Sequence, residues 1–351
     1  MKKVLFALCA VSLLAFSACK KDNVEPENTA ASQPGAPADQ MPTGEGYYNP
    51  GAKIVEIITD DVTAQRWSWE NGLVMSIQEA DENGNMGGAN TFTYSNKRLN
   101  SAMMTIMEMP ITANYTYQGD LLTKVDAVMS PMPVASILYD HNANNKISHL
   151  TVNVNEQVLS MLGPLLGSGL LGNLGDLFGK GPQEKMEITG SNIAVDMEWE
   201  GNNVSRQLVS AELNGTITLG EIRQFVNIDS LLGSMINLLV STDDSLTCPV
   251  TIVVNDTIDM TYDSHPNPYC GFLGRMEPSA YSANNVLTSH NAASAKVTLT
   301  APTIMGNIPI PFSRPLPLGG DDSFTYTYNA AGFPETVTNG MGSVTRIIYQ
   351  Q

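Results

Sequence analysis

Residues 92–99 read Phe92-Thr93-Tyr94-Ser95-Asn96-Lys97-Arg98-Leu99, and the chain repeats this phrase with small changes. Its order is an apolar residue, a polar residue, Tyr or Trp, another polar residue and then a turn. Residues two apart lie on the same face of a strand, so the phrase is typical of a strand end that runs into a hairpin. The copies are centred on the following residues: Trp69, Tyr94, Tyr117, Tyr139, Trp199, Tyr262 and Tyr328.

The first four copies lie at regular intervals. Trp69 and Tyr94 are 25 residues apart, Tyr94 and Tyr117 are 23 apart, and Tyr117 and Tyr139 are 22 apart. This period fits two strands of about seven residues and two turns, which is one hairpin per repeat. We therefore predict an all-β fold: a large curved antiparallel meander sheet, or an open barrel of hairpin repeats, with short Leu-rich helical insertions.

Strand-like alternation returns after residue 186. The apolar runs 250–254 and 257–262 predict a hairpin that turns at Asn255-Asp256, because Asn and Asp favour turns. The proline-rich stretch from Ile308 to Leu318 predicts an edge strand or an extended loop, since proline has no backbone N–H to give to a central strand.

The N-terminus resembles a bacterial lipoprotein signal. Lys2 and Lys3 precede an apolar run, Val4–Phe16, and small residues then lead to Cys19. The run is too short to span a membrane well as a helix. An ordinary signal peptide and an uncleaved anchor helix are the alternatives. We expect Cys19 to be the lipidated N-terminus of the mature protein.

The domain organisation follows from this signal. We expect residues 1–18 to form the lipoprotein signal peptide. We expect residues 19–50 to form a lipidated cysteine with a disordered tether, because their composition cannot bury enough apolar surface to order the chain. We expect residues 51–351 to form a single antiparallel β domain. It contains a Leu/Gly-rich insertion at 156–181 and a helical segment at 228–240.

Charge limits the choice of partners. The chain has 18 basic and 35 acidic residues, which gives a net charge of −17. Such an acidic surface repels phosphate backbones, so nucleic acid is not an expected partner. The expected membrane contact is the N-terminal lipid anchor, which places the protein in the cell envelope. Protein partners are not indicated by any motif.

Cysteines and metal ligands are few. Of four cysteines, only Cys248 and Cys270 lie in the predicted domain, where an exported protein could join them in a disulfide or leave them free. A metal site there would need more ligands than His265 supplies, so we predict no metal and no cofactor.

The two Leu-rich segments allow two interpretations. They can pack on the apolar face of the sheet as structural lids, or they can hold an apolar ligand between themselves and the sheet. In the second case the lining residues would be Leu162, Leu166, Leu231, Leu232 and Met235.

No catalytic motif accompanies these features. The chain lacks Gly-x-Ser-x-Gly, His-Glu-x-x-His and Walker-type sequences, so we do not expect an enzyme. Acidic residues are abundant, but no pair is marked out for glycoside hydrolysis.

The repeated Tyr-x-Tyr-Asn/Asp-x-x-Gly phrase resembles the YD repeats of Rhs-type proteins. Together with the segments 262–269, 284–286 and 326–334, it resembles a set of Bacteroidota envelope lipoproteins of unknown function. The resemblance implies a porin-like or open-barrel β domain at the outer membrane, on its periplasmic or its outer face. It transfers no catalytic residue.

These observations predict a non-enzymatic envelope lipoprotein whose β domain binds or scaffolds another molecule. The first alternative is a carrier of an apolar ligand, such as a lipid. The second is a glycan-binding or hydrolytic surface protein.

Overall fold

The computed structural model describes residues 52–81, 83–106, 109–158, 187–218, 243, 245–274, 281–303, 306–315 and 320–350. Apart from one helical turn at 156–158, these residues form strands and the turns between them. The strands are β1 (Ile54–Thr59), β2 (Val62–Glu70), β3 (Leu73–Ala80), β4 (Met86–Ser95), β5 (Arg98–Ile106), β6 (Met109–Gln118), β7 (Leu121–Met129), β8 (Met132–His141), β9 (Ile147–Val154), β10 (Glu187–Glu200), β11 (Asn203–Thr218), β12 (Thr247–Pro266), β13 (Asn284–Thr303), β14 (Gly306–Pro315), β15 (Gly320–Tyr328), β16 (Pro334–Asn339) and β17 (Val344–Tyr349).

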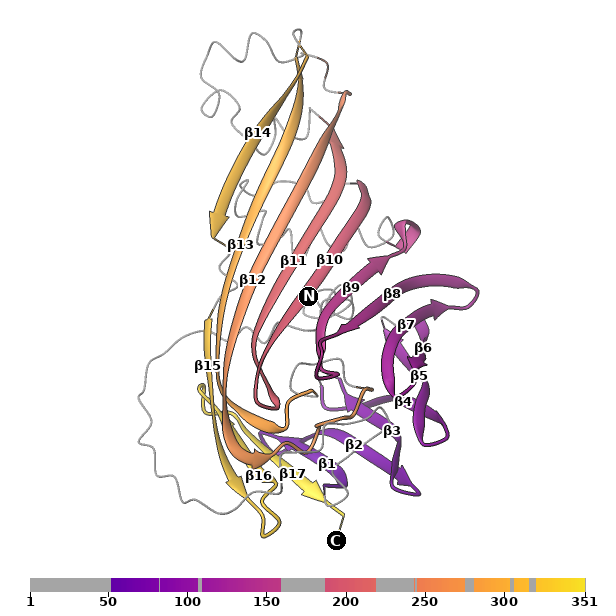
Figure 1. Cartoon of the computed structure of the whole chain (residues 1–351), viewed down its shortest axis with the longest axis vertical. Coiled ribbons are helices and arrows are strands. Elements are labelled where there is room, and N and C mark those ends of the chain that lie inside the picture. Colours follow the sequence, from indigo (N-terminus) through magenta and orange to yellow (C-terminus); the bar gives the residue numbers. More distant parts are fainter. Residues whose placement is uncertain are drawn as a thin grey trace.

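The strands form one antiparallel meander that closes into a barrel (Figure 1). Closure occurs where β1 pairs with both β2 and β17. β13 is long enough to pair with β14 along Ser294–Thr303 and with β15 along Thr288–Asn291. The prediction of an all-β meander or barrel is therefore confirmed, and the sheet is hydrogen-bonded around the full circle.

The barrel is taller on one side. Strands β10 to β13 have 14 to 20 residues each, and their upper parts rise above the shorter strands as a curved wall (Figure 1).

The predicted hairpin at Asn255-Asp256 is wrong, because β12 runs through both residues without a turn. At this level β12 is paired on both sides: Asp256 lies opposite Val209 of β11 and Ala293 of β13. Two complete ladders outweigh the local turn preference of Asn and Asp.

Side chains alternate between an apolar interior and a mainly polar outer face, on which some large apolar side chains, such as Leu138 and Leu208, are also exposed. On β12, Val250, Ile252 and Val254 are buried, whereas the outward Asn255 is exposed. Outward hydroxyls pair across strands: Ser68 with Ser76, Thr93 with Ser101, Thr261 with Thr288, and Thr327 with Thr336. Such pairs stabilise neighbouring strands without apolar contact.

Hairpins at the lower end of the barrel carry a β-bulge beside the turn. In β4–β5, Thr93 pairs with Ser101 and Tyr94 pairs with Leu99, so Asn100 is an extra residue. The same register shift occurs in the hairpins β2–β3, β6–β7, β8–β9, β10–β11 and β15–β16. It also occurs between β12 and β13, which a longer segment connects. A bulge bends the strand and increases its twist. The repeated phrase of the sequence is thus a bulged strand end.

The aromatic residues at this end link successive hairpins. The Tyr94 hydroxyl donates a 2.7 Å hydrogen bond to the carbonyl oxygen of Val74, and Val74 is the residue that pairs with Trp69 across the preceding hairpin. Tyr117 likewise donates to Leu99, the partner of Tyr94. Five more bonds to carbonyl oxygens, of 2.5–2.7 Å, join Trp69 to Ile54, Trp199 to Ile147, Tyr262 to Val204, Tyr326 to Val286 and Tyr349 to Pro334. We call the seven donors the aromatic rim.

The rim continues across the closure of the barrel. Ile54 accepts the bond from Trp69 and pairs with Tyr349, which connects β17 to β1 and β2. Burial raises the pKa of Tyr94 and Tyr349 well above the ordinary value, and that of Tyr262 to about 12. The phenols therefore remain hydrogen-bond donors at neutral pH.

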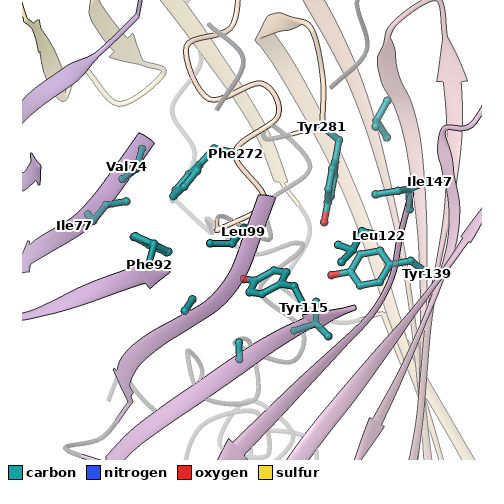
Figure 2. Close-up of a cluster of buried hydrophobic side chains, with 14 of the residues drawn as sticks. Val74, Ile77, Phe92, Leu99, Tyr115, Leu122, Tyr139, Ile147, Phe272 and Tyr281 are labelled. Atoms are coloured by element: carbon teal, nitrogen blue, oxygen red, sulfur yellow. The ribbon is translucent and has the colours of Figure 1, made fainter. Parts of the chain in front are cut away.

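The connection between β12 and β13 fills the lower end of the barrel. We call its described residues, 267–274 and 281–283, the plug. Phe272 is 1% exposed, and its ring centroid lies 5.1 Å from that of Phe92 and 5.6 Å from that of Trp67. Figure 2 shows Phe272 and Tyr281 pointing toward side chains of the short strands. A Cβ atom at Gly274 would lie 2.7 Å from Cε1 of Phe92, so only glycine fits there.

Several predicted features lie outside the described residues. These are the lipidated Cys19 with the signal and tether, residues 159–181 of the Leu/Gly-rich insertion, and the helical segment 228–240. Among the described residues, no helix is long and apolar enough to cross a membrane.

Candidate functional site in the barrel interior

Above the aromatic core, the long strands present an interior of a different kind. The buried side chains there are aliphatic: Ile193, Leu213, Val250, Ile252, Val254, Ile258, Ala293, Ala295 and Leu299. They come from the inward positions of β10 to β13 and lie outside the aromatic core cluster. We call this lining the aliphatic wall. Aliphatic linings of this type suit hydrocarbon ligands.

Two buried polar side chains lie where the aliphatic wall meets the aromatic core. Gln207 of β11 is 0% exposed and lies between the inward residues Val204 and Val209. Asp256 of β12 is 2% exposed and lies between Val254 and Ile258. Both therefore point into the barrel, among side chains that are mostly aliphatic.

The register places the two groups side by side. Gln207 pairs with Ile258, and Asp256 pairs with Val209, so Gln207 and Asp256 are diagonal neighbours on the inner face. Diagonal neighbours in an antiparallel sheet lie about 7–8 Å apart at Cα, which is within the reach of long side chains. Asn291 of β13 pairs with Ile258 from the other side.

The polar atoms of this pair lack hydrogen bonds of regular geometry to the protein, although the Asn291 side chain and the Thr257 N–H lie close enough to act on Asp256. Neither the nitrogen nor the oxygen of the Gln207 amide has a hydrogen-bond partner, and neither carboxylate oxygen of Asp256 accepts a bond of regular geometry. Buried polar groups in proteins nearly always have partners, because each one left unpaired costs about 1–3 kcal/mol. A pair of them on one inner face is therefore a candidate ligand contact.

Burial also changes the acidity of Asp256. Removal from water raises the pKa of this carboxyl from 3.8 to about 6, although the Asn291 side chain and the backbone N–H of Thr257 oppose the shift. The charged form is thus costly in this position. A cationic or hydrogen-bond-donating group beside Asp256 would stabilise the charged form of the carboxyl group.

The acid–histidine pairs of the described strands lie elsewhere. His149 contacts Asp196, and His290 contacts Asp321, both on the outer face with exposed carboxylates. The third pair, His265 with Asp263 at 3.9 Å, lies near the rim, where Asp263 accepts bonds from Tyr328 and from the backbone N–H groups of His265 and Asn285. That carboxylate is fully engaged in holding the strand ends.

The predicted site residues have different outcomes. Cys248 and Cys270 are buried and unbonded, and most of the length of β12 separates them, so the structure contains no bridge between them. Cys248 begins β12, whereas Cys270 belongs to the plug. The predicted lining residues Leu162, Leu166, Leu231, Leu232 and Met235 lie outside the described residues.

Gln207 and Asp256 are not among the residues predicted from sequence, although the pattern of β12 contains a signal for Asp256. The inward positions of β12 read Val250, Ile252, Val254, Asp256 and Ile258, so the acid falls in phase with the apolar residues. The turn predicted at Asn255-Asp256 divided this strand in two, so the inward position of Asp256 could not be recognised from the pattern. Among the described residues, no group of three or more His, Cys, Asp or Glu side chains could hold a metal ion.

Comparisons with known proteins add no relative. The chain matches no protein-family model, and the search of curated proteins finds no match. The interior geometry is therefore the main guide to function.

Proposed function

We propose that this protein is a non-enzymatic, lipid-anchored binding protein of the cell envelope that carries an apolar ligand inside its barrel. The observation that carries the proposal is the radial distribution of polarity. The interior is mainly apolar, and where the aliphatic wall meets the aromatic core it holds two buried polar side chains that lack hydrogen bonds of regular geometry.

The outer face supports a barrel that stands in water and is attached through its N-terminus. A barrel embedded in lipid carries an apolar band on its outside. Here the outside carries hydroxyl pairs and ion pairs, such as Arg206 with Asp259 at 2.6 Å and Lys124 with Asp126 at 2.9 Å. The expected acyl chains on Cys19 would then supply the membrane contact.

The plug closes the lower end of the barrel, so the proposed ligand would be held inside the barrel and would not pass through it. The plug fills this end with aromatic side chains, and Tyr115 donates a bond to the carbonyl oxygen of Leu273 within it. A ligand held by the aliphatic wall would therefore enter and leave at the opposite end.

Native mass spectrometry of the full chain in lipid nanodiscs tests the proposal, with lipid extraction to identify what is bound. We expect a co-purifying apolar molecule. Ala293→Leu adds bulk to the interior beside Asp256 and should reduce its occupancy, whereas Ala292→Leu adds the same bulk to the exposed face and should not.

Two results would count against the proposal. One is the absence of any bound molecule in the wild-type protein after addition of amphiphiles with a dodecyl chain. The other is equal loss of ligand in Ala292→Leu and Ala293→Leu. Membrane partition of Cys19→Ala tests the anchor separately, since unchanged partition would remove the lipoprotein assignment.

A further inference from the structure

The unpaired groups of the interior restrict the chemistry of the ligand. Gln207 offers one acceptor oxygen and an N–H donor, and Asp256 offers two acceptor oxygens when it is charged. A pure hydrocarbon would leave all of them unsatisfied. The ligand must therefore have a polar end as well as an apolar body.

We infer that Gln207 and Asp256 bind the polar end of an amphipathic ligand, and that this end is a primary amine. The inference rests on the proposed function, because it assigns the head group of the ligand that the barrel carries. The alkyl part of the ligand lies along the aliphatic wall above this pair, on Val254, Ile252 and Leu213.

An ammonium group fits these partners better than other simple head groups. It has three N–H donors and no acceptor, so it can bind the Asp256 carboxylate and the Gln207 carbonyl oxygen at once. Hydrogen bonds between charged groups are also the stronger ones. A hydroxyl has a single donor, and a second carboxylate beside Asp256 would meet a like charge.

The neighbouring strands add no competing cation. The described inward positions around Asp256 are Val209 and Ala211 on β11 and Asn291, Ala293 and Ala295 on β13. Within this part of the chain, no Lys or Arg faces the carboxylate. In our proposal the ammonium group of the ligand supplies the cationic partner of Asp256.

Binding of three probes with the same chain length tests the inference: dodecylamine, 1-dodecanol and dodecanoate. Each is kept below the concentration at which it forms micelles or separates from water. The full chain is held in nanodiscs at neutral pH, and probe taken up by empty nanodiscs is subtracted. We expect dodecylamine to bind about tenfold more tightly than dodecanol, as a charge-assisted hydrogen bond provides. Dodecanoate should bind most weakly.

Two variants of equal net charge separate the site from the acidic surface of the protein. Asp256→Asn should abolish the preference for the amine, whereas Asp259→Asn, which removes an outward carboxylate of the same strand, should retain it. Gln207→Leu is a second interior variant and should weaken dodecylamine binding about tenfold as well. Thermal unfolding of each variant checks that it folds.

Each alternative result has a distinct meaning. Equal binding of all three probes overturns the amine assignment and leaves the apolar carrier in place. Equal loss of amine preference in Asp256→Asn and Asp259→Asn shows surface attraction and also overturns the assignment. Binding of none of the probes overturns the assignment and the proposed function together.

Discussion

At the lower end of the barrel, aromatic side chains of the plug and the rim fill the interior and satisfy their own hydrogen bonds. Above them, the aliphatic wall has no such network and adjoins two buried polar groups that lack hydrogen bonds of regular geometry. The first region stabilises the fold, because its Tyr and Trp side chains bury large apolar surfaces while the hydroxyl and indole N–H groups of the rim donate hydrogen bonds to backbone carbonyls. The second region tolerates unsatisfied groups, which is typical of binding sites rather than of structural cores.

The largest expected effect is at the plug. Phe272→Ala should lower the free energy of unfolding by about 3–5 kcal/mol, because it removes a fully buried ring that contacts Phe92 and Trp67. Denaturant unfolding measures this. Met341→Ala, at a side chain that is 52% exposed, should change it by less than about 0.5 kcal/mol. A loss below about 1 kcal/mol for Phe272→Ala would show that the plug is not part of the core.

The buried carboxylate makes stability depend on pH. The pKa of Asp256 is raised to about 6 in the folded protein, so folding favours its protonated carboxyl group. The contribution of this group to the free energy of unfolding is fully present below about pH 4 and is lost as the pH rises to about 6. Asp256→Asn should therefore gain stability over wild type across this window, by at most about 3 kcal/mol at neutral pH. Unfolding curves at pH 4, 5, 6 and 7 measure the difference. The exposed neighbour Asn255→Ser should differ from wild type by a constant amount, and a constant difference for Asp256→Asn would contradict the assignment.

Removing the unpaired amide should stabilise the ligand-free protein. Gln207→Leu keeps the size of the side chain and removes two unsatisfied polar atoms, so we expect a gain of about 2 kcal/mol. Denaturant unfolding of protein freed of bound lipid provides the measurement. A loss of stability instead would mean that the amide has a structural partner.

The smallest expected effect lies at the aromatic rim, where each link is one of several. Tyr94→Phe deletes the bond to the Val74 carbonyl and should cost about 1 kcal/mol. Thr93→Val, which removes an exposed hydroxyl pair with Ser101, should cost less than about 0.5 kcal/mol. Chemical unfolding measures both variants. An equal loss of unfolding free energy in the two would show that the rim hydrogen bonds stabilise the fold no more than the exposed hydroxyl pairs do.

The lower end was the more predictable part from sequence. The spacing of Trp69, Tyr94 and Tyr117 predicted hairpins and strand ends, because a period-two pattern and a turn are local properties. The bulges and the links to the next hairpin were not predictable, since they depend on register between strands.

The interior site escaped prediction for a physical reason. Asp256 follows Asn255, and this dipeptide has a strong local preference for turns. Pairing with β11 and β13 along 20 residues overrides that preference and carries the carboxylate inward. Gln207 is three residues after the inward Val204, so an unbroken alternation from Val204 would turn it outward. The bulge at Ser205 shifts the phase and turns Gln207 inward.

The most direct test of the account is a crystal structure of the protein with dodecylamine that carries bromine on its terminal carbon. We expect the bromine signal inside the barrel against the aliphatic wall of β11 to β13, with the amine nitrogen about 3 Å from the Asp256 carboxylate. A bromine signal confined to the outer face, or an interior position with the amine pointing away from Asp256 and Gln207, would contradict it.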